Sequence, residues 1–303
     1  MRLIKQGFEI IEQPSGLEGM YKMIEMAGRT CYKSEDKITE TSAKEFVDRM
    51  IKSGHGAMLE HGTVYLCIEV PFPKKEVGVV DVNSKEWKLL EKFSTNKYSI
   101  GKYKSPSLYS CAKGYITTNL RVLVENGWLD DLKYWCEPTE YHEKRYTVKW
   151  TIDRVTGESF LRHRMFSFAR ESTRYCNYSK DKFGNEITFI IPCWTNLPEQ
   201  EYGDRVNPKV FNRGNTNGIE TSYVDFLRQA EYSYLNLLSQ GWKPQQARQV
   251  LPFSVSSPLV MTGFASDWLH FFDLRCDSHA HPQAREIATA LKEEFIKRKY
   301  IKE

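Results

Sequence analysis

The most informative stretch of this sequence is residues 162–175, which read RHRMFSFARESTRY. It carries four arginines, one histidine and three hydroxyl side chains besides Tyr175. An arginine presents a planar fork of donors that pairs with two oxygens of a phosphate or carboxylate, and it stays charged at physiological pH. Apolar residues alternate with the charges, which indicates partial burial, and buried arginines require anionic partners or ligands. The stretch therefore predicts a site for a phosphorylated ligand, with a solvated basic helix face as the alternative.

The chain as a whole has the composition of an ordinary soluble globular protein. Its 303 residues carry 43 basic and 39 acidic side chains, and a net charge of +4 is too small for a protein that coats nucleic acid. The first residues contain no apolar run long enough for a signal peptide or a membrane span, so we expect a cytoplasmic protein without a membrane partner. Seven cysteines are scattered without a C-x-x-C pair, which favours reduced thiols over disulfides.

Hydrophobic periodicity and capping signals predict both helices and strands. Helices are expected after Ser15 and Ser42, because each serine is followed three residues later by a glutamate, as in a capping box. Alternating apolar residues predict strands over residues 63–70, 146–155 and 187–191. Later helices are predicted over residues 222–240, 244–251, 266–274 and 282–300. Residues 72–145 are less regular apart from a helix near 118–125, so a single α+β domain is the simplest account.

Several common active-site patterns are disfavoured. Residues 157–161, GESFL, lack the last glycine of the G-x-S-x-G turn of serine hydrolases. Cys276, His279 and His281 are zinc-ligand types, but their spacing fits no usual closed pattern, and we predict no metal site. Glycine-rich phosphate loops are absent from the sequence, so side chains and irregular backbone are expected to hold any nucleotide. Cys193 lies in an apolar stretch, and we interpret it as an inert core thiol.

Two distant arginines, Arg248 and Arg275, lie on or at the end of predicted apolar helices. Taken singly, each is expected to be a salt-bridged structural residue, and Asp273 and Asp277 are ready partners for Arg275. Taken together with residues 162–175, they would form a pocket lined by several arginines.

At this point the sequence resembles a known family. Arg162, His163 and Arg164, followed after seven residues by Ser172, resemble the R-H-R-x7-S signature of the flavin-dependent thymidylate synthases. Residues 54–61, GHGAMLEH, resemble the family's G-H-x-x-x-x-E-H segment. Further stretches similar to its motifs are residues 27–31, 172–175, 247–252 and 274–280. The resemblance implies one catalytic domain over residues 1–303, with a mixed sheet flanked by helices and an insertion at about residues 72–145.

The resemblance also implies a reaction. The family makes dTMP from dUMP, taking a one-carbon unit from methylenetetrahydrofolate and a hydride from reduced FAD, while NADPH re-reduces the flavin. Members use no cysteine nucleophile. They are homotetramers whose active sites are shared between subunits, and neither a nucleic acid nor a membrane partner is expected.

Roles for individual residues follow from the matched positions. The catalytic residues would be Arg275, which can stabilise negative charge developing on the uracil ring, together with Arg174 and His61. The substrate-binding set would be Ser159, Arg162, Arg170, Ser172, Thr173, Arg174, Arg248 and Arg275. The cofactor-binding set would be Thr63, Arg162, His163, Arg164, Met165 and His270.

This chain departs from the family pattern at a few positions. Ala169 and Arg170 stand where many members have Asn-Glu, Ser159 stands where a glutamine is common, and His270 replaces a frequent asparagine. A neutral imidazole can supply one of the hydrogen bonds of an amide but not both. Two alternatives remain open: a non-enzymatic nucleotide or nucleic-acid binding protein that uses the same arginines, and a flavoprotein reductase or oxidase of another substrate.

Overall fold

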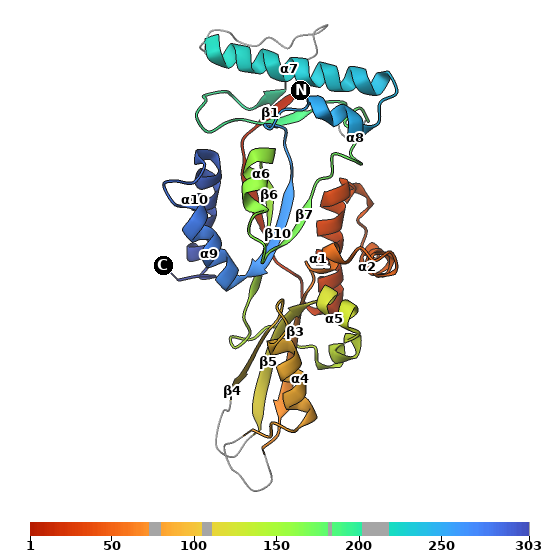
Figure 1. Cartoon of the computed structure of the whole chain (residues 1–303), viewed down its shortest axis with the longest axis vertical. Coiled ribbons are helices and arrows are strands. Elements are labelled where there is room, and N and C mark those ends of the chain that lie inside the picture. The colour runs from red at the N-terminus through yellow and green to blue at the C-terminus, as the bar shows by residue number, and fades with distance from the viewer. Residues whose placement is uncertain (73–79, 105–110, 181–183, 202–217, 303) are drawn as a thin grey trace.

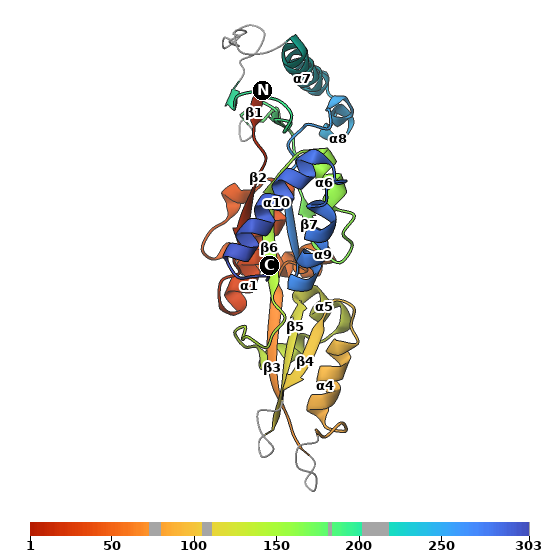
Figure 2. The ribbon, with the colours of Figure 1, turned by 90° about the vertical axis from the view of Figure 1, so that its left-hand side faces the viewer.

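The computed structural model describes residues 1–72, 80–104, 111–180, 184–201 and 218–302. These residues form an elongated molecule in which a central sheet lies between two smaller ones (Figure 1). Figure 2 shows the same arrangement from the side, with the sheets following one another along the long axis. Within the described ranges, no helix combines the length and the apolar character needed to cross a membrane.

The central sheet is antiparallel and carries helices on both faces. Its strand order is β2 (Gly7–Ile11), β6 (Arg145–Thr151), β10 (Leu259–Phe264) and β7 (Ser167–Arg170). Helices α6 (Arg154–Phe160), α9 (Ala265–Arg275) and α10 (Pro282–Lys297) pack on one face, and α1 (Gly16–Tyr32) packs on the other. Every residue of β10 is buried, because Leu259 and Met261 face the first layer while Val260 faces the second. The prediction of an α+β fold is confirmed.

Helix α1 is amphipathic and fits closely against its neighbours. Met20, Ile24 and Ala27 form its buried face, at the spacing expected of a helix. Gly28 allows helix α2 (Ser42–Lys52) to approach, since a Cβ at this position would lie 2.4 Å from the Phe46 ring. The helices begin where the sequence predicts, and the short helices η1 (Glu35–Lys37) and α3 (Gly56–Leu59) follow α1 and α2 along the chain.

The predicted capping boxes at these helix starts are wrong. Ser15 occupies the N-cap position of α1, but its side chain makes no capping hydrogen bond. In α2 the N-cap residue is Thr41, and the Ser42 hydroxyl instead donates to Glu25 of α1 at 2.8 Å. The Ser42 oxygen also accepts a hydrogen bond from the Thr39 backbone amide at 2.9 Å, so the hydroxyl links α2 to α1 and to the preceding turn instead of capping its own helix.

One smaller sheet lies in the region that looked irregular in sequence. Its strand order is β3 (Thr63–Val70), β5 (Ala112–Asn119) and β4 (Ile100–Lys104). Helix α4 (Lys85–Ser94) covers one face of it, and the chain continues through α5 (Leu120–Asn126) and η2 (Leu129–Tyr134). The predicted strand at 63–70 is confirmed, as is the helix near 118–125, although Thr118 itself belongs to β5.

The other small sheet mixes parallel and antiparallel pairs. Its order is β8 (Thr188–Ile190), β1 (Arg2–Ile4) and β9 (Gln200–Glu201), with β8 parallel to β1. Helices α7 (Gly218–Ser239) and α8 (Pro244–Ala247) lie beside it, and η5 (Arg248–Val250) continues α8. The predicted strand at 187–191 and the predicted helices of the C-terminal third are confirmed.

The predicted strand over residues 146–155 ends too late. Strand β6 stops at Thr151, and the Asp153 carboxylate accepts a hydrogen bond from the Thr156 backbone amide at 2.7 Å, which starts α6. The chain therefore turns into a helix just before residues 162–175, and those residues form a turn and strand β7 instead of a basic helix.

Candidate functional site

A cavity of about 300 Å³ lies beside the turn that joins α6 to β7. Its lining residues are Arg162, His163, Arg164, Met165, Phe166, Asp267, His270, Leu274 and Arg275. The first five come from the turn and the other four from α9. Of the six residues predicted to bind a cofactor, the cavity gathers all but Thr63, together with the predicted catalytic Arg275.

Arg275 is held in the cavity by two neutral acceptors. Its Nε donates to His163 Nε2 at 2.8 Å, and one terminal nitrogen donates to the Ser159 carbonyl oxygen at 2.8 Å. The expected ion pair with Asp273 or Asp277 is wrong, since Asp277 instead contacts His279 at 2.8 Å. Because its partners are uncharged, Arg275 keeps its full positive charge for a ligand.

The imidazole of His163 is neutral at physiological pH. Burial lowers its pKa to about 4, and the nearby positive charge of Arg275 acts in the same direction. Because Nε2 accepts a hydrogen bond, the ring proton must sit on Nδ1. The centre of the His270 ring lies 6.1 Å from that of His163, with the two rings in an edge-to-face arrangement, and both histidines line the cavity.

The remaining walls are partly cationic and partly apolar. Arg162 and Arg164 are exposed at the rim, and Met165 is 43% exposed. Asp267 is the acidic member, but its carboxylate accepts a hydrogen bond from the Phe264 backbone amide at 3.0 Å, and burial raises its pKa. The cavity can therefore take an anionic group at its rim and a flat apolar group against its wall.

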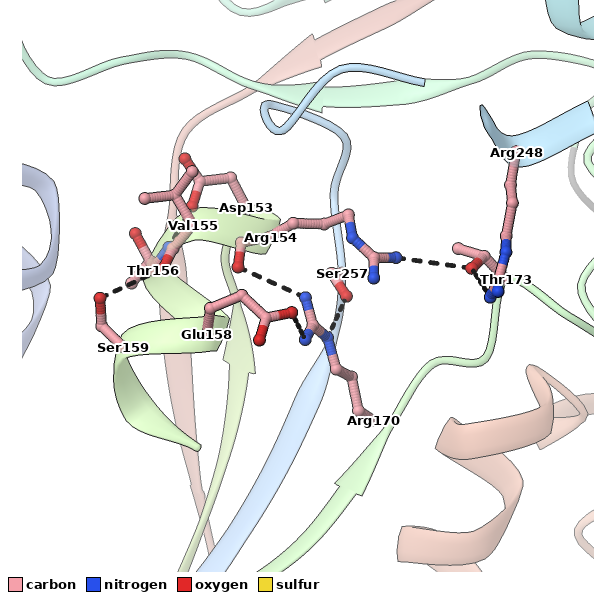
Figure 3. Close-up of polar contacts among 10 residues, drawn as sticks. All are labelled: Asp153, Arg154, Val155, Thr156, Glu158, Ser159, Arg170, Thr173, Arg248 and Ser257. Carbon is pink, nitrogen blue, oxygen red and sulfur yellow. Dashed lines mark hydrogen bonds and ion pairs between the residues drawn. The ribbon is translucent and has the colours of Figure 1, made fainter. Parts of the chain in front are cut away.

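A second group of arginines lies near the start of α6 (Figure 3). Arg154 donates to Thr173 Oγ1 at 3.4 Å, and Arg248 donates to the same oxygen at 3.2 Å. Burial lowers the pKa of Arg154, and the positive charges of Arg170 and Arg248 lower it further. Two guanidinium groups that share one hydroxyl are well placed for an anion, and we call Arg154, Thr173 and Arg248 the Thr173 cluster.

Arg170 lies beside this cluster, but its guanidinium N–H groups form hydrogen bonds within the protein. It donates to Ser257 Oγ at 2.7 Å, to the Glu158 carboxylate at 2.7 Å and to the Arg154 carbonyl oxygen at 3.4 Å (Figure 3). Its side chain is only 14% exposed. Arg170 therefore ties strand β7 to helix α6 and to the segment before β10.

The residues after Arg170 form a turn beside α1. The backbone amide of Ser172 donates to the Cys31 carbonyl oxygen at 2.9 Å, and the exposed guanidinium of Arg174 lies 5.4 Å from the centre of the Tyr175 ring. Glu171 is buried, and its carboxylate accepts a hydrogen bond from the Tyr178 hydroxyl at 2.5 Å. Ser172 and Arg174 are thus the sequence neighbours of Thr173, whereas the Glu171 carboxylate is hydrogen-bonded to Tyr178 in the interior.

His61 and Thr63 lie on the α1 side of the central sheet, away from the cavity. His61 is fully buried, with its Nδ1 2.8 Å from Thr262 Oγ1 of β10. Burial lowers the pKa of His61 to about 3, and Arg145 acts in the same direction. Thr63 accepts a hydrogen bond from Arg145 at 3.2 Å. In one chain these two predicted residues are not brought together with the others.

Two site residues were missed in the sequence. Arg154 was not predicted as a site residue, because the alternating pattern of β6 continues across the start of α6. Asp267 was not predicted either, because it follows strand β10, which shows no alternation of apolar and polar residues. The interpretation of Cys193 as a core residue is wrong: the residue is exposed, as is Trp194. Desolvation nevertheless raises the thiol pKa, so the thiol stays protonated at neutral pH. In the part of the chain that the structure describes, no group of three or more His, Cys, Asp or Glu could hold a metal ion.

The chain is similar to several known proteins. A flavin-dependent thymidylate synthase from Synechocystis sp. is 29% identical over 160 residues, which cover 50% of this chain and 66% of that protein. One from Pyrococcus abyssi is 29% identical over 149 residues, covering 49% of this chain and 53% of that protein. The matches thus span between about half and two thirds of these relatives' length. A solved UMP/dUMP methylase PolB from Streptomyces cacaoi, bound with 5-Br UMP, aligns with 98% of this chain and 92% of that chain at 17% identity and a TM-score of 0.43.

The model of one family matches well over half of the chain. Residues 15–73 and 138–298 fit it, so the match includes both the α6–β7 turn and the α9 wall of the cavity. Residues 74–137, which contain most of the small sheet of β3, β4 and β5, fall outside it. The chain belongs to the thymidylate synthase complementing protein family.

Proposed function

We propose that this protein is a flavin-dependent thymidylate synthase. It would make dTMP from dUMP, with methylenetetrahydrofolate as one-carbon donor, reduced FAD as hydride donor and NADPH as the reductant of the flavin. The observation that carries the proposal is the cavity between the 162–166 turn and α9, because it combines cationic and apolar walls with a fixed, uncompensated Arg275. The names of the curated relatives support the same activity.

The residues of the cavity fit a flavin. Arg162 and Arg164 at the rim would bind the diphosphate, and Met165 would lie against the ring system, with His163 and His270 as further contacts. FAD supplies the redox chemistry when it is bound, and the protein supplies orientation and charge. The neutral state of His163 matters here, because a neutral imidazole can accept a hydrogen bond from Arg275 without neutralising or repelling its positive charge.

The Thr173 cluster fits the phosphate of dUMP. Arg154 and Arg248 would bind its oxygens, and Ser172 and Arg174 would bind the same nucleotide from the adjoining turn. Arg275 would face the uracil ring and stabilise the negative charge that develops on it, which is electrostatic and not covalent catalysis. Cys193 would take no part, since its thiol stays protonated at neutral pH.

A homotetramer with shared active sites would complete this arrangement. A cavity of about 300 Å³ is small even for a drug-sized ligand, so it would hold only part of FAD. The cavity, the Thr173 cluster and the pair His61 and Thr63 also lie apart within one chain. Another subunit would have to supply the missing walls. We also place the enzyme in the cytoplasm, which suits its scattered cysteines.

Absorbance and turnover test the proposal. The purified protein is expected to be yellow, or to become so with added FAD, and to oxidise NADPH faster when dUMP is present. NADPH oxidation that dUMP does not stimulate would instead favour a flavoprotein reductase or oxidase of another substrate.

A second candidate function is nucleotide binding without catalysis, which the Thr173 cluster alone could support. A colourless protein that binds dUMP but fails to bind added FAD would favour this reading. The two functions therefore give different results in one pair of measurements.

A further inference from the structure

Helix α5 brings a residue from outside the family match onto one of the matched motifs. Arg121, near its start, forms ion pairs with Glu60 and with Glu125, the latter at 2.7 Å. Glu60 belongs to residues 54–61, the segment that resembles the G-H-x-x-x-x-E-H motif, whereas Arg121 belongs to the unmatched residues 74–137. The contact therefore joins the insertion to a part of the chain that the family shares.

The same helix start makes one further contact within the segment and one directly after it. A Cβ on Gly56 would lie 3.0 Å from Arg121 Nε, so the guanidinium packs closely against the backbone of that glycine. The backbone amide of Leu120 donates to the carbonyl oxygen of Gly62, the second residue after Glu60 and the first after the segment, at 3.0 Å. The insertion thus contacts the segment through a side chain and through packing, and it contacts the next residue through the main chain.

Glu60 is also held through its main chain. The guanidinium of Arg145 donates to the Glu60 carbonyl oxygen at 3.0 Å, to Thr63 Oγ1 at 3.2 Å and to Ser167 Oγ at 3.2 Å. Ser167 begins strand β7, directly after the turn that lines the cavity. A continuous chain of polar contacts therefore runs from Arg121 through Glu60 and Arg145 to the start of β7.

We propose that Arg121 is a positioning residue: through Glu60 and Arg145 it holds the start of β7, and with it the 162–166 turn of the cavity that we propose to bind flavin. This inference rests on the proposed function. An arginine suits the role because it can pair with two carboxylates while it packs against the backbone of Gly56. Without Arg121, the Glu60 carboxylate, which is 25% exposed, would be free to turn toward water. The backbone of residues 54–61 would shift as a result.

The test compares Arg121→Ala with the wild-type protein. The dissociation constant for FAD is expected to rise on the order of tenfold, because a small displacement of positioning groups is costly. The melting temperature is expected to change little, because both side chains of the pair are partly exposed, at 37% and 25%. Arg121→Lys keeps the charge and should recover part of the affinity and of the bound-flavin absorbance spectrum.

Two control variants separate positioning from general stability. Glu125→Gln removes the other partner of Arg121 and leaves the Glu60 pair in place, so FAD affinity should be unchanged. Lys92→Ala removes the ion pair between Lys92 and Asp131 within the same inserted unit, at 2.5 Å, without touching residues 54–61. It should lower the melting temperature at least as much as Arg121→Ala and still bind FAD normally.

The outcomes distinguish this inference from the proposed function. A wild-type protein that binds no FAD would overturn both. If the wild type binds FAD and Arg121→Ala binds it equally well, Arg121 is not a positioning residue, and the proposed function stands. Equal loss of FAD affinity in Lys92→Ala and Arg121→Ala would also overturn the inference, because the effect would then follow stability alone.

Discussion

The cavity and the Thr173 cluster lie near opposite ends of α6, yet they hold their arginines in different ways. In the cavity, Arg275 rests on two neutral acceptors, His163 and the Ser159 carbonyl, so its geometry is set before any ligand arrives. In the Thr173 cluster, Arg154 and Arg248 crowd onto one hydroxyl, and their mutual repulsion lowers the pKa of Arg154 in addition to the effect of burial. The cavity is suited to holding a positive charge in a fixed direction, and the Thr173 cluster is suited to attracting an anion.

The largest expected effect is that of Arg275→Ala. Under the proposed function, turnover should fall about 100- to 1,000-fold, as when a preorganised electrostatic donor is removed from an active site. Arg275→Lys keeps a charge but lacks the planar arrangement in which two different nitrogens reach His163 and the Ser159 carbonyl, so it should recover only part of the rate. The measurement is dUMP-dependent NADPH oxidation at saturating dUMP. A rate close to that of the wild type would place the cavity outside the reaction.

Arg248→Ala should act mainly on nucleotide binding. One lost charge-assisted hydrogen bond predicts a rise of roughly tenfold to a hundredfold in the dissociation constant for dUMP. FAD affinity should be unchanged, and the remaining dUMP affinity should depend less on salt. Calorimetric titration with each ligand separates the two regions, and a parallel loss of FAD affinity would show that they are one site.

Arg170→Ala is the matched control for that variant. Arg170 lies beside the same cluster, but its donors go to Ser257, Glu158 and the Arg154 carbonyl. The change should lower stability to urea more than it lowers dUMP affinity. A loss of dUMP affinity as large as that of Arg248→Ala would make Arg170 a direct ligand of the nucleotide.

The neutral His163 predicts a smaller, pH-dependent effect. Burial and Arg275 lower its pKa from 6.5 to about 4, so between these values the unfolded chain binds a proton that the folded chain does not. The free energy of unfolding should therefore fall as the pH decreases from about 6.5 toward 4. His163→Gln should flatten this decrease in urea unfolding at a series of pH values. Buried His61 has a pKa of about 3 and acts in the same direction, so part of the slope should remain.

Exposed His270 provides the comparison for that measurement, because it lines the same cavity. His270→Gln removes only one of the smaller influences that lower the pKa of His163, so it should flatten the slope less than His163→Gln does. An equal flattening in both variants would mean that the slope does not come from the interior position of His163.

The smallest effect is expected from Cys193→Ala. The thiol is exposed, lies outside both regions and has a raised pKa, so turnover should stay within about twofold of the wild type. Loss of activity in this variant, with flavin still bound, would contradict a mechanism without a cysteine nucleophile.

The sequence was most informative where the site is local. Residues 162–165 are consecutive, so recognising the motif was enough to find one wall of the cavity. The resemblance to the family also pointed to His270 and Arg275 on the other wall, for which periodicity predicted only a helix. Arg154 could not be found in this way, because a strand pattern runs on into the first residues of α6. Strand β10 escaped prediction because burial on both faces removes the alternation that marks a half-buried strand.

The burial of individual side chains and the identity of their partners could not be predicted from the sequence either. Nothing in the order of residues indicates that His61 is enclosed behind β10, or that Arg170 is engaged by three partners, because both facts depend on contacts between distant segments. The same holds for the insertion, whose Arg121 looks like an ordinary surface residue until the fold brings Glu60 beside it. Sequence patterns identified chemical types, and tertiary contacts decided which of those groups remain available.

The hydroxyl of Thr173 has a consequence for ligand polarity. Its oxygen already receives hydrogen bonds from Arg154 and Arg248, so both of its lone pairs are occupied. The hydrogen that it still carries can only be given away. A ligand atom reaching this point must therefore be an acceptor, such as a phosphate oxygen, and an ammonium group would meet three donors. Thr173→Ser would keep a hydroxyl that accepts two hydrogen bonds and donates one. Thr173→Val would remove the oxygen to which both guanidinium groups donate.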